Sequence, residues 1–317
     1  MDTILFFHMN QLGDLMFSLP VLAGARSCWP GKRLVSVARP EHVSLIKATG
    51  LADEVISRPR GSFKDTWKLM MRLRREKASA ALLFSESPQV LILAAGAGIS
   101  RRVGFAGASL RFLMTETVVR TGVPSLRNNT NLAVKAGIST VPPDYTGLLR
   151  VPEKDLGTAR QWLASHSINP AQMLVAAPGA SKRRTEKCWP RDRWAGLLSR
   201  SIKNGLSPVL IGAPSEKNDL EQLSKTVDLS VPVYCSSDGI LSLAALFKYA
   251  RLFAGIDSGA THLAAAVGLP VVALYGPTDP SQIGPQPLSK HCIIKKTGMN
   301  DISVEEVWAG IAQQLGH

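Results

Sequence analysis

The sequence predicts an α/β protein built from two doubly wound domains. Three observations support this: the length of 317 residues, the alternation of short apolar runs with amphipathic stretches, and the restart of that alternation in the second half. A chain of this length exceeds what one typical core supports, and strands that alternate with helices are typical of parallel βαβ units. Because prolines cluster in residues 141–155, just before the restart, we expect domains over residues 1–160 and 161–317.

The first half alternates strands and helices. We expect a strand where a short apolar run is bounded by turn residues, and a helix where apolar residues recur with a helical period. The expected strands cover residues 3–9, 33–40, 54–59, 78–85 and 101–106, and the expected helices cover 13–30, 42–50, 63–77 and 88–99. The helix over 63–77 has a heavily basic polar face.

The second half repeats the cycle. The expected strands cover residues 173–181, 207–214, 231–236, 251–257 and 270–277, and the expected helices cover 191–205, 215–227, 241–250 and 259–268. Ligands of open parallel sheets bind at the carboxyl ends of the strands. We therefore expect the two domains to face each other across a cleft that holds the site.

The charge is unevenly distributed. The formal net charge is +13, and residues 1–165 hold 22 Lys and Arg against 12 Asp and Glu, which gives +10 (22 − 12). Residues 166–317 hold the remaining 15 against 12, which gives +3 (15 − 12). Such a field attracts polyanions, namely nucleic acid, anionic lipid or a phosphorylated substrate. For any single cation, an ordinary solvated surface explains the charge equally well.

Composition narrows the class of protein. Hydrophobic residues at 45% and charged residues at 19% are typical of a globular chain. The longest apolar runs are shorter than a membrane span needs, and the start of the chain lacks the basic region of a secretory leader, so we expect a cytoplasmic protein. The four cysteines are widely spaced, which favours reduced thiols over disulfides or a zinc site.

A polar turn at residues 257–262 is the first candidate site. Asp257, Ser258 and Gly259 lie where a strand ends and a helix begins, and His262 follows one turn later. The free N–H groups and the dipole of a helix start bind anions, and glycine permits close approach of a phosphate. Taken singly, Asp257 or Ser258 suffices as a helix cap and His262 as a structural histidine. A second turn at residues 276–278 follows the next strand and is expected to lie beside the first.

Two further strand ends carry candidate residues. The loop after the first strand of the second half contains the hydroxyl of Ser181 and four basic residues, Lys187 among them, and a cation there is suited to neutralise a diphosphate. A solvated basic loop explains these charges equally well. In the first half, Asp14 follows the first strand; it is either a helix cap or a general base for an incoming hydroxyl.

Several motifs are missing from the sequence. It contains no P-loop, no complete Gly-x-Gly-x-x-Gly after the first strand, no Gly-x-Ser-x-Gly, no Asp-x-Asp and no clustered metal ligands. We therefore expect no metal site and no cofactor, and we expect diphosphate chemistry to depend on helix ends and cations.

Segments along nearly the whole chain resemble the heptosyltransferases of glycosyltransferase family 9. The matching segments, in chain order, are "NQLGDLMFSLPVL", "PGAS" with "KCWP" and "RW", "DSGATHLAAAVGLPVVALYGPTDP" and "MNDISVEEV". The resemblance implies a GT-B fold of two Rossmann-like domains facing across a cleft, an N-terminal acceptor domain and a C-terminal nucleotide-sugar domain. It also implies metal-independent, inverting transfer of a heptose from ADP-heptose to a lipopolysaccharide inner-core acceptor.

The resemblance also implies roles for single residues, at the positions that match the motifs of the family. The resemblance assigns Asp14 as the general base; the donor contacts that it implies are Ser181, Lys187, Glu216, Asp257, Ser258, Gly259 and His262. The acceptor is then a phosphorylated glycolipid at an anionic membrane, so the basic first half is expected to bind it, with Arg58, Arg60, Lys64 and Arg72 as contacts. The protein is expected to work at the inner face of the inner membrane.

Two alternatives stay open. One is a GT-B transferase that uses another nucleotide sugar in O-antigen or capsule assembly, because the sequence does not fix the donor sugar. The other is a basic polyanion-binding or nucleic-acid-binding protein. Against the second alternative, the sequence has no helix-turn-helix, RRM or zinc signature, and its aromatic content is 6%.

Overall fold

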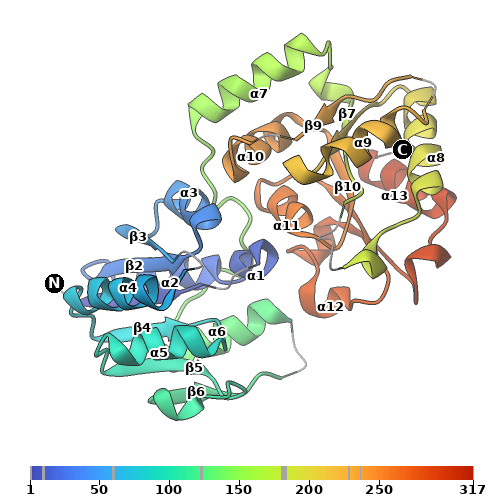
Figure 1. Cartoon of the computed structure of the whole chain (residues 1–317). Coiled ribbons are helices and arrows are strands. Elements are labelled where there is room, and N and C mark those ends of the chain that lie inside the picture. Colours follow the sequence, from blue (N-terminus) through green and yellow to red (C-terminus); the bar gives the residue numbers. More distant parts are fainter. Residues whose placement is uncertain are drawn as a thin grey trace. The chain divides into compact units, whose positions relative to one another are not determined.

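The computed structural model describes residues 2–8, 11–58, 61–121, 124–179, 184–227, 229–235 and 237–316. The chain divides into two compact units, Met1–Arg150 (unit 1) and Val151–His317 (unit 2). The division precedes the predicted boundary at residue 160, because helix α7 (Glu153–Ser165) packs on α10 (Ile240–Tyr249) of unit 2 (Figure 1). The roles predicted for the two domains remain predictions.

Unit 1 alternates strands and helices as predicted up to residue 105. Its elements are β1 (Thr3–Phe7), α1 (Leu12–Met16), α2 (Leu19–Cys28), β2 (Arg33–Ala38), α3 (Pro40–Thr49), β3 (Glu54–Ser57), α4 (Phe63–Arg75), β4 (Ala80–Leu83), α5 (Pro88–Gly96), β5 (Arg101–Phe105), β6 (Glu116–Val118) and α6 (Ser125–Ala136). A 3₁₀ turn, η1 (Arg111–Leu113), precedes β6. The strand β6 and the helix α6 were not predicted.

Unit 2 follows the same plan. Its strands are β7 (Met173–Ala177), β8 (Ser207–Ile211), β9 (Val233–Tyr234), β10 (Leu252–Ile256), β11 (Val271–Tyr275) and β12 (Cys292–Lys295). Its helices after α7 are α8 (Arg191–Lys203), α9 (Lys217–Ser224), α10, α11 (Gly259–Ala266), α12 (Pro280–Ile283) and α13 (Val304–Leu315). Its 3₁₀ turns include η3 (Thr185–Lys187) and η4 (Pro214–Glu216).

The two sheets share one topology. In the described residues each unit has a six-stranded parallel sheet, with the strand orders β3-β2-β1-β4-β5-β6 and β12-β11-β10-β7-β8-β9. Numbered within its own unit, each sheet therefore has the doubly wound order 3-2-1-4-5-6. The predicted α/β class is confirmed. In this topology ligands bind outside the carboxyl ends of the strands where the order reverses, which are β1 and β4 in unit 1 and β7 and β10 in unit 2.

Local sequence explains why these elements form. The strand β1, with the sequence TILFF, is buried along its whole length, as expected for a strand covered by helices on both faces. The helix α4 begins at a capping box in which Ser62 and Asp65 bond each other's backbone N–H groups. The helix α3 ends at Gly50, whose φ of 66° is left-handed.

Each sheet has a buried core between its strands and helices. In unit 1, apolar residues of β1, β2 and β4 pack against α4 and α5, and α2 and α6 pack against each other (Figure 1). In unit 2, apolar residues of β7, β10 and β11 pack against α8, α9 and α13. Among the described residues, no helix is long and apolar enough to cross a membrane.

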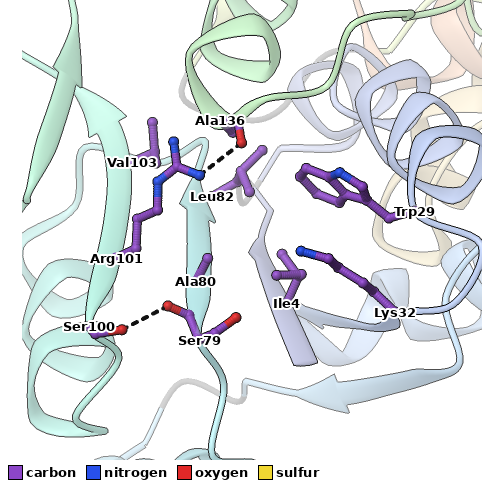
Figure 2. Close-up of a pocket in the computed structure, with 10 residues that line it drawn as sticks. All are labelled: Ile4, Trp29, Lys32, Ser79, Ala80, Leu82, Ser100, Arg101, Val103 and Ala136. Carbon is purple, nitrogen blue, oxygen red and sulfur yellow. Dashed lines mark hydrogen bonds between the residues drawn. The ribbon is translucent and has the colours of Figure 1, made fainter. Parts of the chain in front are cut away.

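A cavity of about 300 Å³ lies at the amino-terminal end of the unit 1 sheet (Figure 2). Trp29 and Lys32 face Arg101 across the start of the strands in this view. The polar groups of the cavity already bond to protein: Arg101 pairs with Glu116 at 2.6 Å, and Lys32 pairs with Asp2 at 3.0 Å. The cavity is therefore at the opposite end of the sheet from the predicted site, and its charges are balanced internally.

Candidate active site

Three polar side chains of unit 2 meet at the carboxyl ends of neighbouring strands. Lys187 ends the turn η3 in the loop after β7, Asp257 follows β10 directly, and Thr278 follows β11. The strands β11, β10 and β7 are adjacent and parallel, so their carboxyl ends lie along one edge of the sheet. The prediction that the turn at residues 276–278 lies beside the turn at 257–259 is confirmed.

Asp257 joins the other two residues. Its Oδ2 accepts hydrogen bonds from Lys187 Nζ at 2.5 Å and from Thr278 Oγ1 at 2.9 Å. The side chains of Lys187 and Asp257 are 13% and 7% exposed, so the ion pair is largely removed from water. Interactions of this kind are charge-assisted and stronger than those between neutral groups. The cluster therefore holds one cation in a fixed place at the edge of the sheet.

The helix α11 begins beside this cluster. Ser258 is its N-cap residue, yet the hydroxyl makes no capping hydrogen bond, and Gly259 is the first helical residue. The first N–H groups of a helix have no partner within it, and the helix dipole is positive there. Because the Asp257 carboxylate bonds to Lys187 and Thr278, the capping role considered for Asp257 and Ser258 does not describe this turn. The arrangement is suited to bind an anion.

His262 lies in α11 behind this turn and is 3% exposed. The pKa of His262 is lowered to about 4, chiefly by burial; the charge of Asp257 opposes the shift, and the charge of Lys187 adds to it. The imidazole is therefore neutral at pH 7. Its distance from solvent fits a role in supporting the turn.

Glu216 lies beside two glycines at the same edge of the unit 2 sheet. A Cβ at Gly179 would lie 2.5 Å from Glu216 Oε1, and one at Gly212 would lie 3.0 Å from Oε2. Glu216 Oε2 accepts a hydrogen bond from the N–H of Ala213 at 2.7 Å. The glycines after β7 and β8 thus leave room for this carboxylate. Sequence reasoning missed this feature, because both glycines lie inside the predicted strands 173–181 and 207–214.

The loop that carries Lys187 is anchored by Trp189. This ring is 3% exposed, packs edge-to-face on Trp194 with 5.0 Å between ring centroids, and donates from Nε1 to the carbonyl of Ile302 at 2.9 Å. A buried Trp two residues after Lys187 limits the movement of the lysine. The sequence "KCWP" contained this signal, but the anchoring role was not predicted.

Asp14 lies in unit 1, in the first turn of α1 after β1, and is half-buried. The N-cap residue of α1 is Gln11, so Asp14 is not the helix cap that the sequence left open. An acid in the first turn is stabilised by the helix dipole. The carboxylate is thus at the carboxyl end of β1, where the topology places a ligand.

A buried histidine supports the segment around Asp14. His8 is fully buried, stacks on Phe84 with 5.6 Å between ring centroids, and bonds through Nδ1 to Ser18 Oγ at 2.7 Å and through Nε2 to Ser36 Oγ at 3.0 Å. Ser18 Oγ donates its proton to the carbonyl of Leu15 at 2.6 Å. Ser18 must then accept from Nδ1–H, so Nε2 accepts from Ser36. Burial lowers the pKa of His8 to about 3, which keeps the ring neutral.

Two of the predicted acceptor residues that the structure describes, Arg58 and Arg72, bond to other side chains of unit 1. Arg58 is 5% exposed and donates to Gln89 Oε1 at 3.3 Å; burial lowers its pKa. Arg72 pairs with Glu54 at 2.7 Å and also with Glu76. Glu54 begins β3, so Arg72 lies toward the amino-terminal end of the sheet, away from the edge of Asp14. Both side chains therefore bond to other residues of unit 1, and the acceptor contacts predicted for Arg58 and Arg72 remain predictions.

The remaining predicted residues are placed as follows. Lys64 is exposed in the first turn of α4, whereas Arg60 and Ser181 lie outside the described residues. In the part of the chain that the structure describes, no three His, Cys, Asp or Glu side chains form a group that could hold a metal ion. The four cysteines are free thiols.

Several known proteins with similar sequences or structures are heptosyltransferases. Lipopolysaccharide heptosyltransferase 2 of Escherichia coli (strain K12) is 23% identical over 327 residues, which cover 98% of this chain and 93% of that protein. The structure of a family 9 glycosyl transferase from Veillonella parvula DSM 2008 matches with a TM-score of 0.90 at 20% identity, covering 99% of this chain and 97% of that one. E. coli ADP-heptose lps heptosyltransferase II matches with a TM-score of 0.85 at 22% identity, covering 99% and 98%.

The fold of these structures confirms the predicted GT-B-type fold of two α/β units. The sequence profile described as glycosyltransferase family 9 (heptosyltransferase) matches residues 66–307, which is more than half of the chain. The prediction of an enzyme is also confirmed, since the profile defines a glycosyltransferase. Because this profile matches more than half of the chain, the chain belongs to glycosyltransferase family 9.

Proposed function

We propose that this enzyme transfers a heptose from ADP-heptose to a lipopolysaccharide inner-core acceptor, with inversion and without need of a metal ion. Two findings support the choice of substrates. A relative whose match covers 98% of the chain is a lipopolysaccharide heptosyltransferase, and one of the similar structures is an ADP-heptose lps heptosyltransferase. The observation that carries the proposal is the bonded cluster of Lys187, Asp257 and Thr278 at the start of α11.

The cluster of Lys187, Asp257 and Thr278 is suited to stabilise the diphosphate of the departing ADP. When the bond between the sugar and ADP breaks, negative charge develops on the diphosphate. Lys187 and the free N–H groups at Ser258 and Gly259 meet that charge, which is the role that a metal ion has in other transferases. Glu216, at the same edge, is suited to accept hydrogen bonds from the ribose hydroxyls, and His262 supports the turn.

Asp257 holds Lys187 in place for binding of the donor. In the described structure the carboxylate neutralises Lys187, and Thr278 shares the same oxygen. The pair is largely buried, so removal of the lysine alone leaves an uncompensated anion. That anion would face the diphosphate and repel it. The two residues therefore act on donor binding as a unit.

Asp14 completes the reaction as the general base. Its carboxylate takes the proton of the acceptor hydroxyl while that oxygen forms a bond to the anomeric carbon. The bond from the anomeric carbon to the diphosphate oxygen breaks in the same displacement, and its electron pair leaves with ADP. A single displacement of this kind inverts the anomeric configuration.

The acceptor is a phosphorylated glycolipid, so we propose that the enzyme works on the cytoplasmic side of the inner membrane, at its anionic surface. The excess positive charge of residues 1–165 supports this. Of the acceptor candidates that the structure describes, Lys64 is exposed. Arg58, buried after β3, would reach an acceptor only at the carboxyl end of the sheet.

A single and a double substitution test the donor site. We expect Lys187→Met to raise the Kd for ADP-heptose about 10–100-fold, the range for a lost hydrogen bond between charged groups. The double variant Lys187→Met with Asp257→Asn should recover part of the loss, because the repelling carboxylate is gone. Lys203→Met, an exposed lysine of α8, is the matched control and should bind as the unmodified enzyme does. Titration calorimetry measures all four proteins.

Two results would contradict the donor site. One is an unchanged Kd for Lys187→Met, and the other is a double variant that binds no better than the single one.

Transfer in the presence of a chelator tests the metal independence: activity lost on chelation and restored by a divalent metal would refute it. The anomeric configuration of the product, read by NMR coupling constants, tests inversion.

A further inference from the structure

The helix α4 presents a strip of large apolar side chains to solvent. Phe63, Trp67 and Met71 are spaced by four residues, so they share one face of the helix. Their exposed fractions are 84%, 52% and 36%. Isolated exposed apolar residues are ordinary, but a contiguous strip on one helix marks an interaction surface.

The strip is flanked by positive charge. Exposed cations on the outward side of α4 are Lys64, Lys68, Arg74 and Arg75. The acid of this helix is Asp65, which lies about 60° around the helix from Lys68 by helical geometry. Asp65 Oδ2 accepts from the N–H of Ser62 at 2.9 Å and so completes the cap. We call the three apolar and four basic residues the α4 face; it is apolar and positive throughout.

The α4 face lies near the functional edge of unit 1. The helix starts after the carboxyl end of β3 and leads to the amino end of β4. Phe63, Lys64 and Trp67, in its first two turns, are therefore near the same edge of the sheet as Asp14. The opposite side of α4 packs on the sheet and on α5, with Leu73 fully buried (Figure 1). The helix is thus held by unit 1 while the strip stays uncovered by that unit.

We propose that the α4 face docks on an anionic phospholipid bilayer, with the helix lying in the plane of the interface. Aromatic rings favour the level of the lipid headgroups, and an amphipathic helix with a basic flank binds parallel to such a surface. Each cation near the headgroups adds to the attraction. The inference deepens the membrane contact of the proposed function and rests on it, and it identifies the lipid-contacting residues.

Lipid fits the α4 face better than nucleic acid does. A nucleic acid would also be attracted by the cations and would stack bases on aromatic rings. Met71 has no ring, and it extends the strip along the helix axis with aliphatic surface. A continuous apolar strip beside a basic flank is the pattern of a helix that enters an interface.

Vesicle binding tests the docking. The full chain is sedimented with vesicles made of equal parts of phosphatidylcholine and phosphatidylglycerol, and with phosphatidylcholine alone, in the absence of donor and acceptor. We expect binding to the anionic vesicles that falls at least about tenfold in the double variant Phe63→Ala with Trp67→Ala. Lys68→Gln with Arg75→Gln should lower it about 25-fold, at about fivefold per cation. Leu229→Ala, which removes a leucine of unit 2 that is 60% exposed, is the control.

Fluorescence identifies the contact. The structure describes all six tryptophans; Trp67 is exposed, whereas the other five are half-buried or buried. Brominated lipids should quench Trp67 in bound protein, and Trp67→Phe should bind but show little quenching. Quenching that persists in Trp67→Phe would overturn the assignment. So would binding that is equal on both vesicle types.

A third measurement separates the docking from the proposed function. Phe63→Ala with Trp67→Ala should retain transfer to a deacylated acceptor in solution and lose transfer to an acceptor embedded in vesicles. Unchanged vesicle binding with intact transfer in this variant would overturn the docking alone. Absence of transfer from ADP-heptose by the unmodified enzyme would overturn the function alone. Oligonucleotide binding that falls as much as vesicle binding in this variant would show a nucleic-acid face instead.

Discussion

Replacement of His8 by Asn should flatten the pH dependence of the stability of unit 1. His8 is fully buried between Ser18 and Ser36, and its pKa is lowered from 6.5 to about 3 by burial. In the unfolded chain the histidine takes up a proton near pH 6.5, whereas the folded protein leaves it neutral. Protonation therefore stabilises the unfolded state as the pH falls from 6.5 toward 3, and the free energy of unfolding decreases.

The size of the effect follows from the two pKa values. Each pKa unit corresponds to about 1.36 kcal/mol. Between the ordinary value of 6.5 and pH 5, the folded ring stays neutral because its pKa is about 3. His8 should then lower the free energy of unfolding by about 2 kcal/mol between pH 7 and pH 5, and an Asn side chain removes that contribution.

Hydrogen exchange of the β1 strand in a urea series, at pH 7 and at pH 5, measures the stability of unit 1 in the full chain. The His8→Asn variant should be less stable at pH 7, because the stacking on Phe84 is lost, but its stability should fall by about 2 kcal/mol less on acidification. His166→Asn, which replaces an exposed histidine of unit 2, is the matched control and should retain the full dependence. Equal pH dependence in His8→Asn and the unmodified protein would refute a buried neutral His8.

Three further predictions concern the site. Asp14→Ala should reduce transfer about 10²–10⁴-fold, the usual contribution of a general base, while the Kd for the donor stays near its original value. Thr278→Val should lower the free energy of unfolding of unit 2 by about 1.5 kcal/mol, because Asp257 loses a hydrogen bond, as urea unfolding would measure. Gly179→Ala should raise the Kd for ADP about tenfold, because the new Cβ would lie 2.5 Å from Glu216 Oε1 and displace that carboxylate.

Matched variants define what would contradict these predictions. Asp144→Ala removes another carboxylate of unit 1, which accepts from the N–H of Thr146, and should leave transfer intact. Equal turnover in Asp14→Ala and Asp144→Ala would refute the general base. Gly196→Ala, where the nearest atom to an added Cβ is 3.6 Å away, should bind ADP normally, so equal loss in both glycine variants would exclude a specific effect on Glu216.

Much of the fold followed from pattern. Every predicted strand up to residue 105 and from 173 to 277 is present, because strands buried on both faces read as apolar runs. The strand β6 was missed because it is a short edge strand, Glu116–Val118, with polar side chains and partial exposure. The helix α6 was missed because its first half, "SLRNNTN", is polar and buries two asparagines that a pattern of apolar residues does not reveal.

The position of the site on the sheet could be predicted from the topology, but most bonds between its side chains could not. Strand ends placed Lys187 and Asp257 at one edge, but their direct bond joins residues that no local pattern relates. The basic cluster around α4 shows the limit of charge counting. Arg58 and Arg72 were predicted as acceptor contacts from charge alone, and the bond of Arg58 to Gln89 and the pairing of Arg72 with Glu54 could not be read from the sequence.

Transfer to truncated lipopolysaccharide acceptors from a panel of nucleotide sugars tests the central claim most directly. The unmodified enzyme is incubated with ADP-heptose or with other ADP-activated and UDP-activated sugars, and the acceptor mass is measured. The account predicts the addition of one heptose from ADP-heptose with release of ADP, and a large loss of this transfer in Asp14→Ala. Efficient transfer from a different nucleotide sugar, with none from ADP-heptose, would contradict it.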